Sequence, residues 1–307
     1  MSEAMLMPGL EERRAEIGGR EMRYFVAGSG PSLILVHGLG GSATNWTAMA
    51  PQLARRRRLL VPDLPGHGCS APAEAPDGLG SIADQVGALA AHERMLPAAI
   101  VGHSLGCEVA VQLVLRRSDA VSALVLIAAS GIAATGRTAA AFIGVTTRVR
   151  PARVAARFRS SVARRPTLRR LVFGGWGAYD PRDLSPTVTL GFLDGAAHAR
   201  DTATAGQGLL RLDTRLDLGR VQCPSLVVWG ARDRLTPVAG GFEYARRLRA
   251  PIRVLAAAGH LVVGERPSEC VALVEGFLDA LDGVREVDEL PFDVELGGKS
   301  RSERLNT

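Results

Sequence analysis

The sequence predicts an α/β protein built on a mostly parallel sheet with helices on both faces. Short apolar runs, of the kind that strands buried on both faces require, alternate with helical patterns along most of the chain. Hydrophobic residues make up 47% and charged residues 22% of the 307 residues, which excludes a disordered chain or a fibrous repeat. This length fits one core with room for an insertion.

The predicted elements follow one another in a regular order. Residues 13–26 alternate polar and apolar side chains around Gly18 and Gly19, which predicts a β-hairpin. Buried strands are then predicted at residues 33–36, 59–61, 98–101, 123–127, 225–229 and 252–255. Helices are predicted at residues 46–56, 82–95, 105–116, 240–248 and 267–281. Strands joined through helices form parallel pairs.

The alternation stops between about Gly131 and Leu216. No strand-like run occurs there, and helix-like segments are separated by prolines. We expect this stretch to form a helical cap inserted over the carboxyl ends of the strands. The predicted organisation is a first core part at 1–133, a cap at 134–215, a second core part at 216–283 and a polar C-terminal tail at 284–307.

The strongest functional signal is the sequence GHSLG at residues 102–106, between a predicted strand and a predicted helix. In that context the pattern is typical of a nucleophile elbow, a tight turn that raises a serine hydroxyl above the sheet. The flanking glycines let neighbouring backbone pass close by, and the N–H groups that begin the helix face the same point. We therefore predict that Ser104 is a nucleophile.

A serine hydroxyl needs a base to take its proton, and the base needs an acid to orient its ring. His260 and Asp233 each follow one of the last two predicted strands, which makes them the candidates for base and acid. The chain order Ser104, Asp233, His260 agrees with a known order of such triads. Asp63 also follows a strand, but it precedes the serine and opens a turn rich in glycine and proline, which favours a structural role.

The negative charge that develops during attack needs two backbone donors. One is expected from Leu105, the residue after the nucleophile. The second is expected from the flexible loop HGLGG at residues 37–41. In that loop we predict the N–H of Leu39 as the donor, with that of Gly40 as the alternative.

With these motifs, the chain resembles the cap-bearing serine hydrolases of the α/β-hydrolase superfamily. The matching stretches are HGLGG (37–41), VPDLPGHGCS (61–70), VGHSLG (101–106), LVVWGARDRLTP (226–237) and AAGHLVVGERP (257–267). The resemblance implies an eight-stranded sheet and an active site without cofactor or metal. Cys107 stands where relatives often carry glycine. Relatives that cleave halides or epoxides carry aspartate as nucleophile, so Ser104 disfavours those reactions.

The function expected from these residues is the cleavage of small-molecule carboxylic esters or lactones through an acyl-enzyme. One alternative keeps the triad and changes the bond, as in C–C bond hydrolysis, acyl transfer or perhydrolysis. A second alternative is a non-catalytic accessory or ligand-binding protein with the same fold. The sequence does not predict the oligomeric state.

Charge and cysteine usage limit the choice of partners. Net charge is +6, and Lys299 is the only lysine, so the basicity comes from arginine. Acidic residues are interspersed over most of the chain, which disfavours nucleic acid. For the arginine-rich stretch 148–170 we expect either attraction of an anionic substrate or an acidic surface, or a solvated face of the cap helices. Scattered cysteines disfavour a disulfide framework or a zinc site.

With no signal peptide or membrane span in the sequence, we expect a cytoplasmic protein.

Overall fold

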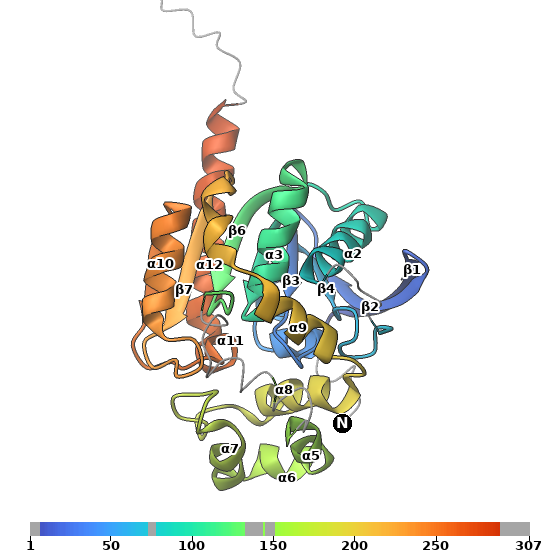
Figure 1. Cartoon of the computed structure of the whole chain (residues 1–307), viewed down its shortest axis with the longest axis vertical. Helices are drawn as coiled ribbons and strands as arrows, with labels where there is room; N and C mark the ends of the chain where they lie inside the picture. Colours follow the sequence, from blue (N-terminus) through green and yellow to red (C-terminus); the bar gives the residue numbers. More distant parts are fainter. Residues whose placement is uncertain (1–6, 73–77, 133–143, 145–150, 289–307) are drawn as a thin grey trace, which may run out of the picture.

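An eight-stranded sheet forms the centre of the computed structural model, which describes residues 7–72, 78–132, 144 and 151–288 (Figure 1). Its strands are β1 (Glu11–Ile17), β2 (Arg20–Ala27), β3 (Ser32–Val36), β4 (Arg58–Pro62), β5 (Ala98–His103), β6 (Val121–Ile127), β7 (Ser225–Gly230) and β8 (Ile252–Leu255). The spatial order is β1-β2-β4-β3-β5-β6-β7-β8. β2 pairs antiparallel with β1 and β4, and the other pairs are parallel. The prediction of a mostly parallel sheet is confirmed.

The strands form where the apolar runs predicted them. Every residue of β5 and of β7 is buried, as expected for central strands covered on both faces. At the other end of the sheet, Gly18 and Gly19 join β1 to β2 with φ values of 59° and 77°. Those left-handed values suit a two-residue hairpin turn and favour glycine at both positions.

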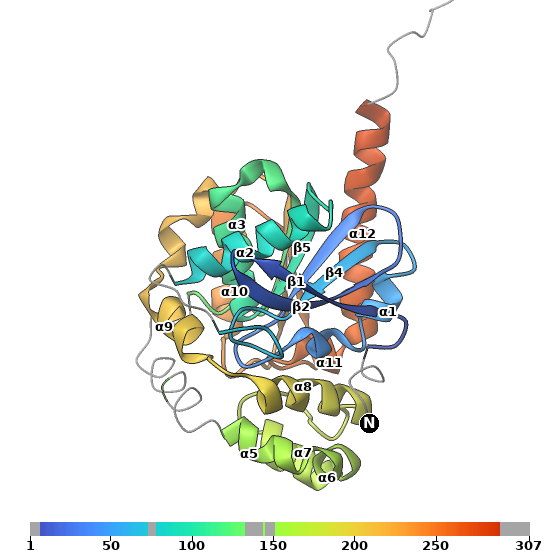
Figure 2. The same ribbon diagram turned by 90° about the vertical axis from the view of Figure 1, so that its right-hand side faces the viewer.

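Helices cover both faces of the sheet (Figures 1 and 2). On one face α2 (Leu79–His92), α3 (Leu105–Arg116) and α10 (Val238–Leu248) contribute to one apolar cluster. A second apolar cluster lies on the other face. It is formed with residues of α11 (Val262–Glu265), α12 (Pro267–Asp288), the 3₁₀ turn η2 (Ala43–Trp46) and α1 (Ala50–Leu53). These two cores hold the strand ends in place.

Between β6 and β7, the described part of the chain contains the α-helices α5 (Pro151–Arg157), α6 (Arg159–Arg164), α7 (Pro166–Phe173), α8 (Pro186–His198) and α9 (Ala203–Arg211). Figure 1 shows α8 next to the sheet core and α5, α6 and α7 beyond it. α8 contacts η2, where the Thr44 hydroxyl donates to the Gly191 carbonyl at 2.7 Å, while α5 and α6 contact α8. α9 returns to the core and contacts α2. Residues 134–143 and 145–150 of the predicted cap lie outside the described residues, as does residue 133 before it.

Two predicted boundaries are wrong. The helix predicted at 46–56 is a 3₁₀ turn followed by the four-residue α1. Pro51 lies in the first turn of α1, where its missing N–H is tolerated. A helix that began at residue 46 could not run on through Pro51 without losing a backbone hydrogen bond. The tail predicted from Val284 begins later, because α12 runs to Asp288. Polar residues do not by themselves end a helix, and the next proline is Pro291. Residues 289–307 lie outside the described residues.

Candidate active site

Ser104 lies on the turn between β5 and α3, as the GHSLG pattern predicts. Its φ of 54° and ψ of −116° are strained for a residue other than glycine. A Cβ on Gly102 would lie 2.6 Å from the backbone nitrogen of Cys107, and one on Gly106 would lie 2.1 Å from the carbonyl oxygen of Val36. Both distances are far below van der Waals contact, so the turn requires glycine at both positions.

The structure brings the three predicted side chains together in one hydrogen-bonded series. His260 Nε2 lies 3.0 Å from Ser104 Oγ, and His260 Nδ1 lies 2.9 Å from Asp233 Oδ2. All three side chains are buried, with exposed fractions of 9% for Ser104, 7% for Asp233 and 3% for His260. With Nδ1–H donating to the carboxylate, Nε2 is free to accept the serine proton.

Asp233 is held in place by donors from its own loop. The backbone N–H groups of Leu235 and Thr236 donate to Oδ1 at 2.9 and 2.8 Å, and the Thr236 hydroxyl donates to Oδ2 at 2.6 Å. Burial acts to raise the pKa of Asp233, but the charge of His260 and these hydrogen bonds outweigh it, so the pKa lies below its ordinary value. The carboxylate therefore stays ionised and orients the imidazole.

His103 supports the backbone of the base, a role that the sequence did not indicate. Its Nε2 donates to the carbonyl oxygen of His260 at 2.9 Å. Burial, the largest cause, and the nearby His260 together lower the pKa of His103 to about 3. The ring is therefore neutral at physiological pH and acts as a fixed donor. The middle position of G-x-S-x-G accepts many residue types, which is why the motif alone does not single it out.

The HGLGG loop runs beside the nucleophile. A Cβ on Gly38 would lie 3.1 Å from the Cβ of Ser104, and Gly41 N–H donates to the Gly38 carbonyl at 3.1 Å to close the turn. Within the described part of the chain, no protein atom accepts a hydrogen bond from the N–H of Leu39 or of Leu105. Both predicted donors thus lie on segments next to Ser104 and keep an unused N–H.

Asp63 has the structural role that its turn suggested. Its buried carboxylate accepts hydrogen bonds from Arg23 Nε at 2.7 Å and from the backbone N–H groups of Ala43 and Cys69, each at 2.8 Å. It thereby ties β2 and the segment that begins η2 to the loop after β4.

Glu265 connects the loop that carries His260 to the helical segment. Its Oε1 accepts the N–H of Gly259 at 2.9 Å, and its Oε2 accepts the N–H of Tyr179 at 2.7 Å. In addition, Leu261 N–H donates to the Gly177 carbonyl at 3.0 Å. Burial raises the pKa of Glu265 to about 7. The sequence contained no signal for this contact beyond the position of Glu265 five residues after the histidine.

Glu108 of α3 joins three segments behind the nucleophile. Its buried carboxyl group accepts the Tyr244 hydroxyl at 2.5 Å, the N–H of Gly131 at 3.0 Å and the hydroxyl of Thr214. Gly131 follows β6 and Thr214 precedes β7, so one carboxyl group holds both ends of the helical segment. Burial is the main cause that raises the pKa of Glu108. Sequence reasoning missed this residue.

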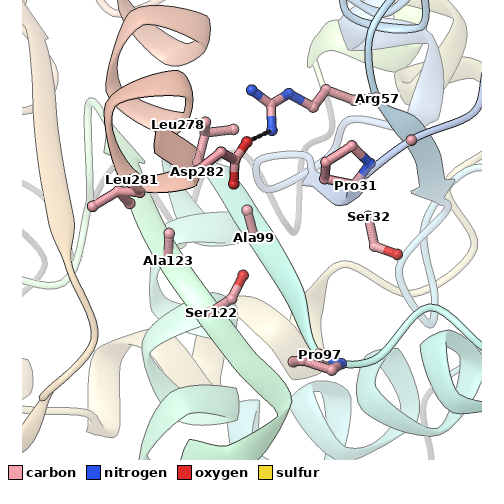
Figure 3. A pocket seen from close by; sticks show the side chains of 11 residues that line it. Pro31, Ser32, Arg57, Pro97, Ala99, Ser122, Ala123, Leu278, Leu281 and Asp282 are labelled. Atoms are coloured by element: carbon pink, nitrogen blue, oxygen red, sulfur yellow. Dashed lines mark hydrogen bonds and ion pairs between the residues drawn. The ribbon is translucent and has the colours of Figure 1, made fainter. Parts of the chain in front are cut away.

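A separate pocket of about 290 Å³ lies at the opposite end of the sheet, where β3, β5 and β6 begin (Figure 3). Its charged groups are Arg57 and Asp282, which form an ion pair of 2.6 Å. Arg57 also contacts Asp279 at 2.6 Å and Glu275 at 3.0 Å, and all three acids belong to α12. Since its charges serve to hold α12 on the core, this pocket is not a second candidate site.

All four cysteines are free thiols. Over residues 7–72, 78–132, 144 and 151–288, no group of three or more His, Cys, Asp or Glu side chains could hold a metal ion. In the same ranges no helix is both long enough and apolar enough to cross a membrane.

Comparison with known families agrees with this fold. The model of the alpha/beta hydrolase family matches residues 33–273, and the chain belongs to that family. The match extends from β3, through the turn with Ser104, past the loop with His260.

The similar proteins include an acetyltransferase component, an esterase and a hydrolase of known structure. The chain is 32% identical over 277 residues to the dihydrolipoyllysine-residue acetyltransferase component of the acetoin cleaving system of Pseudomonas putida, which covers 88% of this chain and 70% of that protein. It is 31% identical over 246 residues to the pimeloyl-(acyl-carrier protein) methyl ester esterase of Chromobacterium violaceum, with coverage of 74% and 86%. The structure of a hydrolase from Pseudomonas aeruginosa superposes with a TM-score of 0.70 at 25% identity, covering 87% of this chain and 98% of that one. Family, fold and an esterase relative together support a hydrolase.

Proposed function

We propose that the protein cleaves carboxylic esters or lactones, with Ser104 as nucleophile, His260 as base and Asp233 as the acid that orients it. The observation that carries the proposal is the hydrogen-bonded series from Asp233 through His260 to Ser104, with distances of 2.9 and 3.0 Å. The strained backbone at the serine adds support, because strain of this kind is typical of functional positions. The named activity of the Chromobacterium violaceum relative, a methyl ester esterase, points to the same bond.

In the proposed mechanism, Ser104 Oγ attacks the carbonyl carbon while His260 Nε2 takes the hydroxyl proton. The N–H groups of Leu39 and Leu105 stabilise the resulting oxyanion. The histidine then gives its proton to the leaving alkoxide oxygen, and an acyl-enzyme remains. Water, activated by the same histidine, attacks the acyl-enzyme, which releases the acid and restores the serine hydroxyl.

We assign the helical segment between β6 and β7 the role of a cap that covers the site and selects the substrate. The hydrogen bonds of Tyr179 with Glu265 and of Gly177 with Leu261 support this role, because they join the segment directly to the loop that carries His260. A cap in contact with that loop also excludes water, which strengthens the electrostatic interactions in the site.

The test is covalent labelling with a fluorophosphonate probe, read by intact mass, on wild type and Ser104→Ala. The probe reacts with activated serines and requires no knowledge of the substrate. We expect one adduct on wild type and none on the variant. A panel of esters of increasing acyl length and of lactones then identifies the substrate class. A folded wild-type protein without adduct would instead favour the non-catalytic accessory role.

Acyl transfer is the second candidate, because the Pseudomonas putida relative is named as an acetyltransferase component. Both reactions share the acyl-enzyme and differ in what accepts the acyl group. Hydrolysis of an activated ester in the presence of alcohol or thiol acceptors separates them. Faster ester consumption with a new acylated product indicates transfer, and unchanged consumption with free acid as product indicates hydrolysis.

A further inference from the structure

The outer helices of the inserted segment form an unusually cationic surface. Residues 151–179 contain seven arginines and no acidic residue. They form α5, α6 and α7, which lie on the side of α8 that faces away from the sheet (Figures 1 and 2). We name the outer side of these three helices the distal face. Residues 148–150, which continue the arginine-rich stretch, lie outside the described residues.

Most arginines of the distal face have no ion-pair partner among the residues that the structure describes. Among the described residues, none forms an ion pair with the five arginines at 153, 157, 159, 164 and 165. Arg169 is different, since it is buried and donates to the carbonyl oxygens of Ala163, Pro181 and Arg182. The seventh, Arg170, helps to lower the pKa of the nearby Asp180. The fold therefore uses Arg169 and Arg170 and leaves the other five charges available.

Large apolar side chains are exposed among these arginines. The exposed fraction is 57% for Val154, 63% for Phe158 and 80% for Leu171. Val154 and Phe158 are four residues apart, about one helical turn, and they alternate with Arg153 and Arg157 along the chain. An exposed apolar side chain next to unpaired cations is typical of segments that lie in the interface of a bilayer.

We propose that the distal face docks on the surface of an anionic lipid bilayer. A guanidinium group can donate two hydrogen bonds at once to the oxygens of one phosphate group. Clustered arginines are also attracted to the negative surface of an anionic leaflet. Phe158 and Leu171 would enter the region between headgroups and acyl chains. A bilayer requires no shaped groove, which fits isolated apolar side chains spaced by cations. An acidic protein partner fits less well, because interfaces of that kind bury a contiguous apolar centre. The proposal does not depend on the proposed activity.

The experiment is flotation of the full-length protein with vesicles of phosphatidylcholine alone or with 30% phosphatidylglycerol. The test variants are Arg153→Glu/Arg157→Glu and Phe158→Ser. The matched control is Arg55→Glu/Arg117→Glu, which makes the same change in net charge at two exposed arginines outside the distal face. Circular dichroism and urea unfolding establish that each variant is folded.

We expect the wild type to float with the anionic vesicles and not with the neutral ones, and binding to weaken as salt is raised. The double charge reversal should weaken binding by at least about tenfold, and Phe158→Ser by about threefold or more. The control should stay within about twofold of wild type. Equal binding to both vesicle types, or equal losses for the test and control variants, would overturn the proposal. Retention on immobilised polyglutamate without vesicle binding would also overturn it and indicate an acidic protein partner.

Discussion

Replacement of Glu108 by alanine should destabilise the protein more than any ordinary surface substitution. The change removes the shared acceptor of the Tyr244 and Thr214 hydroxyls and of the Gly131 N–H. Tyr244 and Thr214 are both 0% exposed, so water does not replace the lost acceptor without rearrangement. Three buried donors would be left unpaired.

The magnitude follows from those three donors. A buried donor without a partner costs about 1–3 kcal/mol, which gives a sum of roughly 3–9 kcal/mol. We expect the lower part of this range, about 3–5 kcal/mol, because removal of a buried carboxyl group also removes its own desolvation cost. Burial raises the pKa of Glu108, so that cost is present in the wild type. A loss of this size is a large fraction of the stability of a typical domain, about 5–15 kcal/mol.

The assay is urea unfolding followed by circular dichroism, with two matched variants. Glu108→Gln keeps one carbonyl acceptor and should lose less than Glu108→Ala. Tyr244→Phe removes a single donor and should lose about 1–2 kcal/mol. Because the two side chains touch, the losses of the double variant should not add. A loss below about 1 kcal/mol for Glu108→Ala, or additive effects of Glu108→Ala and Tyr244→Phe, would show that this carboxyl group is not the shared acceptor that stabilises the fold.

Three further expectations concern the site. Ser104→Ala and His260→Ala should each lower ester turnover by about 10⁴–10⁶-fold, and Asp233→Asn somewhat less; turnover near the wild-type rate in steady-state assays would contradict the triad. The pKa of Glu265 is raised to about 7 from 4.5. The folded chain therefore keeps a proton that the unfolded chain releases, and the melting temperature should fall as pH rises from about 4.5 through 7. Glu265→Gln should flatten this profile, and an unchanged profile would exclude Glu265 as its source. In Gly106→Ala, the new Cβ would lie 2.1 Å from a carbonyl oxygen of β3, so we expect a loss above about 3 kcal/mol in urea unfolding or insoluble protein; wild-type stability would show that the turn can relax.

The strands and the three side chains of the hydrogen-bonded series were predictable because their signals are local. An apolar run followed by a turn marks the carboxyl end of a strand, and Ser104, Asp233 and His260 all follow such ends. Parallel strands bring those ends to one edge of the sheet, so chain order alone indicated which side chains meet. The strand boundaries were predicted within about two residues for the same reason.

The supporting residues were not predictable because their partners are distant in sequence. Glu108 meets Tyr244 across 136 positions, and His103 meets His260 across 157. Nothing in the immediate neighbourhood of Glu108 or His103 separates a buried acceptor or donor from an exposed polar side chain. The short α1 shows a different limit, because the helical period there was real but Pro51 and the return to β4 decided how much helix formed.

The attachment of the inserted segment at Glu108 bears on how such a protein can diversify. Gly131, which follows β6, and Thr214, which precedes β7, both donate hydrogen bonds to the carboxyl group of Glu108 in α3. The two ends of the inserted segment therefore meet the core at the same place. Its length and composition can change over evolutionary time without disturbing the register of the sheet. The same attachment makes this position suitable for exchanging one insertion for another in protein design while keeping the sheet and the turn with Ser104.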